Sequence, residues 1–97
     1  MFVLTLAYVV DLDEVDLVRD EHLAWVAEQY DAGRFLASGP QVPRTGGVIL
    51  AKTMPKDELE AVIASDPFVR EGVATYDVIK FAATTTVDEL AALRERV

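Results

Sequence analysis

The sequence predicts an α+β domain, and three observations carry this prediction. At 97 residues the chain has room for one hydrophobic core. Some stretches show the two-residue apolar alternation of strands, and others show the spacing of an amphipathic helix. Capping and turn residues separate these stretches. The resulting element order is β-α-β-β-α-β-α.

The first strand and helix have the clearest signals. Residues 2–10 form a β-prone run whose two faces are both largely apolar, so both need cover. Asp11 stands three residues before Glu14, a spacing that resembles a capping box, and apolar residues follow at helical spacing. Gly33 is expected to end this helix.

The remaining elements are shorter. Two strands are expected at residues 35–37 and 48–51, joined by a loop rich in glycine and proline. Pro55 suits the first turn of a second helix, which ends before the segment Ser65-Asp66-Pro67-Phe68. A fourth strand is expected at residues 76–82. Thr86 and Glu89 then form a capping box for a terminal helix over residues 87–97, whose apolar positions include Val97.

This order predicts a ferredoxin-like βαββαβ domain with a four-stranded antiparallel sheet and both helices on one face. The other face of the sheet would remain bare. With 52% hydrophobic residues, the chain carries more apolar surface than a domain of this size readily buries. We therefore expect a homodimer in which two sheets pack face to face.

Charge and composition exclude several classes of function. Nine basic against 17 acidic residues give a net charge of -8, which disfavours binding to nucleic acids or anionic membranes. No run approaches the roughly 20 apolar residues needed to span a bilayer, and the apolar start lacks the basic region of a signal peptide. The absence of cysteine excludes disulfides and fits a cytoplasmic location.

His22 and Asp66 are the candidate catalytic residues. His22 is the only histidine and lies on the apolar stripe of the first helix, facing the sheet. It is either a general base or a half-buried side chain satisfied by one hydrogen bond. Asp66 precedes Pro67 and Phe68, where it either orients the imidazole or simply caps a helix. For each of these two residues, the sequence alone leaves the catalytic and the structural interpretation open.

Weaker signals surround this pair. Arg19 lies one turn before His22 and either binds a substrate carboxylate or pairs with an acid such as Asp16. Ser38, Gly39 and Pro40 end a strand, where they allow close approach of a ligand or merely form a turn. No metal-binding or nucleotide-binding motif is present, so neither a metal nor a cofactor is expected.

Taken together, these residues resemble the YciI-like (YCII-related) family. The resemblance rests on Arg19 with His22, on Ser38-Gly39-Pro40, and on Asp66-Pro67-Phe68, supported by glycines at positions 33, 46, 47 and 72. It covers residues 1 to about 81. The terminal helix falls outside it.

The resemblance implies a dimeric α/β-barrel similar to muconolactone isomerases, with a cavity containing a catalytic histidine and aspartate. These roles carry over to His22 and Asp66, and Arg19, Ser38, Gly39 and Pro40 become candidates for binding substrate. Some members of the family act in dehydrochlorination or isomerisation of ring-derived compounds.

Two functions remain open at this point. The first is a cofactor-independent lyase or isomerase that removes a proton next to a carbonyl or lactone. The second is a non-catalytic dimeric module that binds a small ligand or recruits a partner protein. In that second case His22 is structural.

Overall fold

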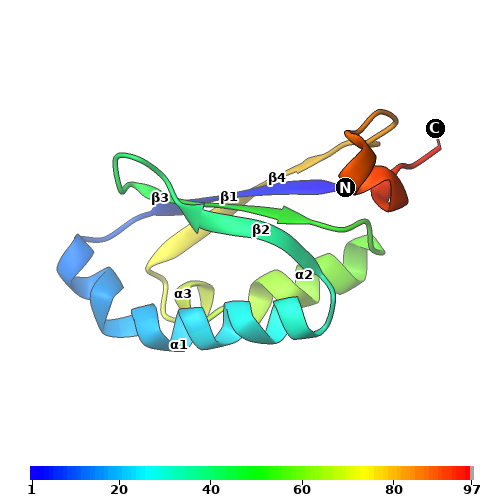
Figure 1. Cartoon of the computed structure of the whole chain (residues 1–97). Helices are drawn as coiled ribbons and strands as arrows, with labels where there is room; N and C mark the ends of the chain where they lie inside the picture. The colour runs from blue at the N-terminus through cyan, green and yellow to red at the C-terminus, as the bar shows by residue number, and fades with distance from the viewer. Residues whose placement is uncertain (97) are drawn as a thin grey trace.

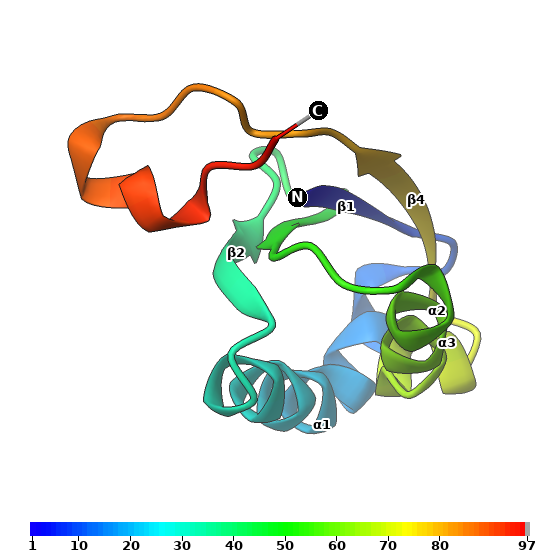
Figure 2. The same cartoon turned by 90° about the vertical axis from the view of Figure 1, so that its right-hand side faces the viewer.

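A computed structural model describes residues 1–96 and has the predicted ferredoxin-like arrangement (Figure 1). The antiparallel sheet has the strand order β2-β3-β1-β4. Its strands are β1 (Phe2–Tyr8), β2 (Phe35–Pro40), β3 (Gly46–Ala51) and β4 (Ala74–Lys80). The α-helices are α1 (Leu12–Asp31), α2 (Lys56–Ala64) and α3 (Pro67–Arg70). All three lie below one face of the sheet (Figures 1 and 2).

The core lies between the sheet and these helices. Phe2, Leu4 and Leu6 alternate along β1 and are buried on the helix side, as the period of a strand requires. Trp25 from α1 and Phe68 from α3 belong to the same cluster. Burial of each such side chain contributes about 1.5–3 kcal/mol, and the contacts fix the two helices relative to the sheet.

The strands differ from prediction mainly at their ends. β2 continues from the expected end at residue 37 to Pro40, because Gly39 and Pro40 pair with β3 instead of forming only a turn. β4 spans Ala74–Lys80 where 76–82 was expected, since pairing with β1 begins soon after the turn at Gly72 (φ 68°). At Gly46 an added Cβ would lie 1.8 Å from the Leu6 carbonyl oxygen. Glycine there permits β3 to pair closely with β1.

The boundaries of α1 and α2 agree closely with those predicted from the sequence, whereas the short α3 was not predicted. Asp11 occupies the N-cap position of α1, although its side chain makes no capping hydrogen bond, so the expected capping box does not form. Gly33, with φ 75°, follows the end of α1. Pro55 precedes α2, which ends at Ala64 as predicted. None of the helices within residues 1–96 combines the length and apolar character needed to cross a membrane.

The helix-free face of the sheet is apolar. The pairing registers place Val3 opposite Leu50 and Ile79 on this face. Val48 lies on the same face, 36% exposed, and Ile79 is 58% exposed. Several apolar side chains of the sheet therefore have no cover from the helices.

The segment after residue 82 forms less helix than predicted. Where an α-helix over 87–97 was expected, residues 83–96 contain a single helical element, a 3-10 helix over Asp88–Leu93. No residue of this element is buried, so no apolar face holds a longer helix in place. Thr86 forms no capping box; it accepts hydrogen bonds from Arg94 instead. The expected contribution of Val97 lies outside the described residues.

Glu95 fastens this segment to the body of the protein. Its carboxylate accepts hydrogen bonds from the Met1 amino group at 2.7 Å, from the Thr53 hydroxyl and from the Ala83 N–H at 3.0 Å. The Met1 amino group, followed by the Thr53 and Ala83 donors, lowers the pKa of Glu95 from 4.5 to about 2. Figure 2 shows the segment extending past β2 from this attachment.

Replacing Glu95 by glutamine is expected to release the segment, because the charged acceptor shared by the three donors is lost. The native attachment should be complete above the ordinary pKa of 4.5 and weaken as the pH falls toward about 2, since the lowered pKa means that folding favours the ionised form. Amide NMR signals of residues 84–96, followed against pH, measure both effects. Glu89→Gln in the same segment is the control; if it and Glu95→Gln behave alike, Glu95 is not the anchor.

Candidate active site

The site is built around His22 on α1. Its Nδ1 atom lies 2.8 Å from Oδ1 of Asp66, and the side chain is 13% exposed. The imidazole stacks on the Phe68 ring, with centroids 3.9 Å apart and an interplanar angle of 5°. A hydrogen bond at one edge and a stacked ring on one face together fix the orientation of His22.

Asp66 lies at the end of the loop before α3 and is fully buried. Its Oδ1 accepts a hydrogen bond from the Phe68 N–H at 2.9 Å as well as the contact with His22. Its Oδ2 accepts a hydrogen bond from the Tyr76 hydroxyl at 2.5 Å. Asp66 therefore caps α3 and also contacts the imidazole of His22, so the two interpretations of this residue do not exclude each other.

This geometry selects one tautomer of His22. An ionised carboxylate only accepts hydrogen bonds, so Nδ1 carries the proton that points at Asp66. In the neutral ring, Nε2 then keeps a lone pair. In chemical terms, such a ring can accept a proton at Nε2, and the Asp66 carboxylate then lies next to the positive charge.

A second contact holds the loop that carries Asp66. The Trp25 indole N–H donates to the Ser65 hydroxyl at 2.8 Å, and this hydroxyl donates to the Val62 carbonyl oxygen at 2.6 Å. Trp25 is buried on α1, one turn beyond His22. The same helix therefore positions the histidine and anchors the loop of its partner.

His22 lines a cavity of about 350 Å³ between α1 and the sheet. Every other residue that the sequence suggested for substrate binding lines it too: Arg19, Ser38, Gly39 and Pro40. The remaining walls are mostly apolar or aromatic and come from Leu6, Tyr8, Leu23, Val26, Arg44, Gly47, Val48, Ile49 and Phe68. Asp66 is not part of the lining, but it contacts two residues that are, His22 and Phe68.

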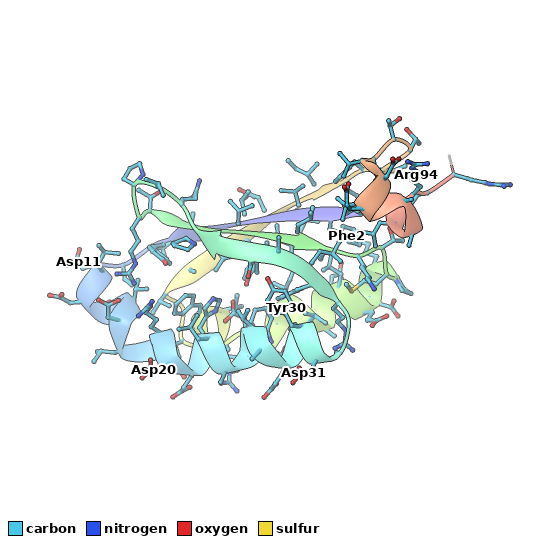
Figure 3. All side chains as sticks on the ribbon, viewed as in Figure 1. Phe2, Asp11, Asp20, Tyr30, Asp31 and Arg94 are labelled. Carbon is cyan, nitrogen blue, oxygen red and sulfur yellow. The ribbon has the colours of Figure 1, made fainter. Side chains whose placement is uncertain are left out.

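Ser38 is tied to α1 by a side-chain contact. Its hydroxyl lies 2.7 Å from the hydroxyl of Tyr30. Figure 3 shows Tyr30 on the side of α1 that faces β2, whereas Asp20 and Asp31 point away from the sheet. The contact holds β2 against the C-terminal part of α1.

Two arginines, Arg19 and Arg44, line the cavity. Arg44 donates to Asp16 at 2.5 Å and lies 5.8 Å from the centroid of the Tyr8 ring. This hydrogen bond lowers the pKa of Asp16. The pairing of Arg19 with Asp16, one of the two interpretations of this arginine, does not form; Arg44 reaches this carboxylate from the loop between β2 and β3. Among residues 1–96, Arg19 makes no ion pair within 4.0 Å.

Sequence reasoning missed Tyr76 and Arg44. In the sequence, Tyr76 was recognised only as the first residue of an expected strand. Its partner, Asp66, is ten residues away in another part of the fold. Arg44 lies in a loop whose path follows no periodic pattern. Neither residue type nor spacing distinguished these side chains from ordinary polar residues on the surface.

The fold and the site define a ferredoxin-like domain with a histidine–aspartate pair beside a cavity. A family model for the YCII-related domain matches residues 1–82, and the chain belongs to this family. The segment that Glu95 fastens lies beyond the matched region.

A solved structure with a similar fold is 5-chloro-2-hydroxyhydroquinone dehydrochlorinase (TftG) from Burkholderia phenoliruptrix AC1100, in complex with 2,5-dihydroxybenzoquinone. The TM-score is 0.69 at 18% sequence identity, over 84% of this chain and 93% of that chain. No curated protein matches the sequence.

Proposed function

We propose that this protein is a small cofactor-independent enzyme in which His22 removes a proton from carbon. The observation that carries the proposal is the 2.8 Å contact between His22 Nδ1 and a fully buried carboxylate, on a histidine that also lines a cavity. Nδ1 is engaged by Asp66, which leaves Nε2 as the basic nitrogen available to a substrate.

The proposed step is abstraction of a proton next to a carbonyl or lactone group. Nε2 takes the proton, and the electrons of the broken C–H bond form an enolate. In an elimination these electrons then form a carbon–carbon double bond and chloride leaves with the electrons of its bond. In an isomerisation the imidazolium returns a proton to a different carbon. Asp66 stabilises the imidazolium in either case.

The character of the cavity supports a ring-derived substrate. Its walls combine the Phe68 ring with aliphatic side chains, and its volume of about 350 Å³ suits a small molecule. The solved relative is named a dehydrochlorinase and holds a small quinone. Arg19, which lines the cavity without a carboxylate partner in residues 1–96, is proposed to bind a negatively charged substituent.

One observation favours a non-catalytic alternative. Asp66 caps α3 through the Phe68 N–H, and the contact with His22 satisfies a half-buried histidine. Both residues therefore have structural roles that require no reaction. In this alternative the cavity captures a small ligand without converting it.

The test incubates the native protein in D₂O with chlorinated hydroquinones and with lactones in matched forms, with and without a carboxylate. Deuterium uptake at carbon by NMR reports proton abstraction, and chloride release reports elimination. We expect exchange or release, faster for the carboxylate-bearing members because of Arg19. Binding to several compounds with neither exchange nor release would support the alternative.

We propose further that two copies pair through the helix-free face of the sheet, whose exposed apolar side chains have no cover from the other described residues, 1–96. Ile79→Glu should dissociate the dimer, because a two-fold axis places the new charge in the interface twice. We expect the variant to lose about 2 kcal/mol or more of association free energy per substituted site. Light scattering after gel filtration measures the mass. Leu17→Glu, at an apolar position of α1 that is 85% exposed, is the matched control. A native monomer, or a dimer unchanged by Ile79→Glu, contradicts the pairing.

A further inference from the structure

Tyr76 completes the hydrogen bonding of Asp66. Two donors approach Oδ1, namely the His22 imidazole and the Phe68 N–H, whereas Oδ2 accepts from the Tyr76 hydroxyl at 2.5 Å. Asp66 has no exposed surface, so solvent does not replace a missing donor. Tyr76 is thus the side chain that determines where Oδ2 lies.

The position of Tyr76 in the fold makes it a rigid support. It lies in β4 opposite Leu6 of β1, with its side chain on the helix side of the sheet. Burial, followed by the nearby Asp66 carboxylate, raises the pKa of the Tyr76 phenol. The phenol therefore stays neutral and keeps the proton that it donates to Asp66.

Tyr76 does not line the cavity, and Asp66 lies between it and His22. It therefore has no route to a bound substrate except through the carboxylate. When the Tyr76 hydroxyl holds Oδ2, the Asp66 carboxylate stays turned so that Oδ1 faces Nδ1 of His22. Without that hydrogen bond, the carboxylate is freer to rotate about the Cβ–Cγ bond. Precise orientation of the base is what a pre-organised site needs.

We propose that Tyr76 is a positioning residue for the His22–Asp66 pair, holding Oδ2 of Asp66 so that Oδ1 remains directed at the imidazole. This inference rests on the proposed function for its effect on rate. Its effect on the geometry of the pair is independent of any reaction. The three residues come from α1, the loop before α3 and β4, so the site joins three parts of the fold.

The experiment compares native protein with Tyr76→Phe by ¹H–¹⁵N NMR of the His22 ring. We expect the Nδ1 proton to exchange with solvent about tenfold faster in the variant. A change of about tenfold is the effect expected from losing one hydrogen bond to a charged group. With a substrate found in the panel, kcat should fall by about tenfold while KM stays within about twofold, because Tyr76 does not touch the cavity. Amides of β1 serve as an internal reference for global unfolding.

Tyr30→Phe is the matched control, because it also removes one tyrosine hydroxyl but breaks a contact with Ser38 instead. Its Nδ1 proton should exchange as in the native protein. If Tyr76→Phe does not fold, the native protein still gives a test: the Tyr76 hydroxyl proton should appear downfield and be protected from exchange.

The outcomes separate this inference from the proposed function. Faster Nδ1 exchange in Tyr76→Phe without turnover in any native sample supports the positioning role and counts against the enzyme. Nδ1 exchange equal to that of the native protein, or an unprotected Tyr76 hydroxyl, overturns the inference whatever the native protein catalyses. A rise in KM with kcat unchanged also overturns it.

Discussion

Replacing His22 by glutamine is expected to lower kcat by about 10²–10⁴-fold, the usual contribution of a general base. Glutamine keeps an N–H group to donate to Asp66 but has no basic nitrogen. The carboxylate therefore retains a partner while proton abstraction is lost. Deuterium uptake at carbon, measured on the best substrate of the panel, gives the ratio of rates directly.

The control for this variant is Glu21→Gln, which changes the adjacent exposed residue of α1 outside the cavity. It should retain the native rate. Unfolding curves and light scattering establish that both variants keep the native fold and mass. Undiminished turnover in a well-folded His22→Gln protein would show that another group is the base.

Replacing Asp66 by alanine is expected to cost about 3–5 kcal/mol of unfolding free energy, because it removes a fully buried carboxylate and leaves one buried and two partly buried donors without an acceptor. These donors are the imidazole of His22, the N–H of Phe68 and the hydroxyl of Tyr76. Urea unfolding followed by circular dichroism measures the change. Because the cap of α3 is lost at the same time, the loop before α3 should also become more open to hydrogen exchange.

Asp11→Ala is the matched control, since Asp11 also occupies an N-cap position but makes no capping hydrogen bond through its side chain. It should change the free energy of unfolding by no more than about 0.5 kcal/mol. Equal losses in the two variants would mean that the buried contacts of Asp66 contribute little. Asp66→Asn, which keeps one acceptor oxygen, should be more stable than Asp66→Ala but should still lose activity, because its amide no longer selects the Nδ1–H tautomer.

The sequence contained most of the information needed for the fold. Alternation along β1 and helical spacing along α1 depend on neighbours in the chain, so both were predictable. Gly33 was also predictable, because a helix commonly ends at a residue with positive φ. The start of β4 depends on pairing with β1 across the sheet, and local patterns do not specify such pairing. The terminal helix with its capping box at Thr86 did not form as expected, because no residue of the Asp88–Leu93 element is buried.

The candidate site was predictable only in part. His22 and Asp66 were suggested by residue type and by resemblance, yet their 2.8 Å contact spans 44 positions and follows from the fold. Of the two interpretations of Arg19, the ion pair with Asp16 does not form; Arg44, from a distant loop, pairs with that acid. The role of Tyr76 depends on which face of β4 it occupies. Side chains that act through tertiary contacts carry no local signature.

The neighbourhood of Trp25 has a practical consequence. This indole is the only one in the chain, and its ring centroid lies 5.7 Å from that of the only histidine. A protonated imidazole so close to an indole quenches its fluorescence, and any ligand in the adjacent cavity that absorbs at the emission wavelength would quench it as well. The intrinsic fluorescence of Trp25 therefore reports on changes at the candidate site. Compounds can be screened in a fluorimeter for entry into the cavity before any reaction is known, without attaching a dye.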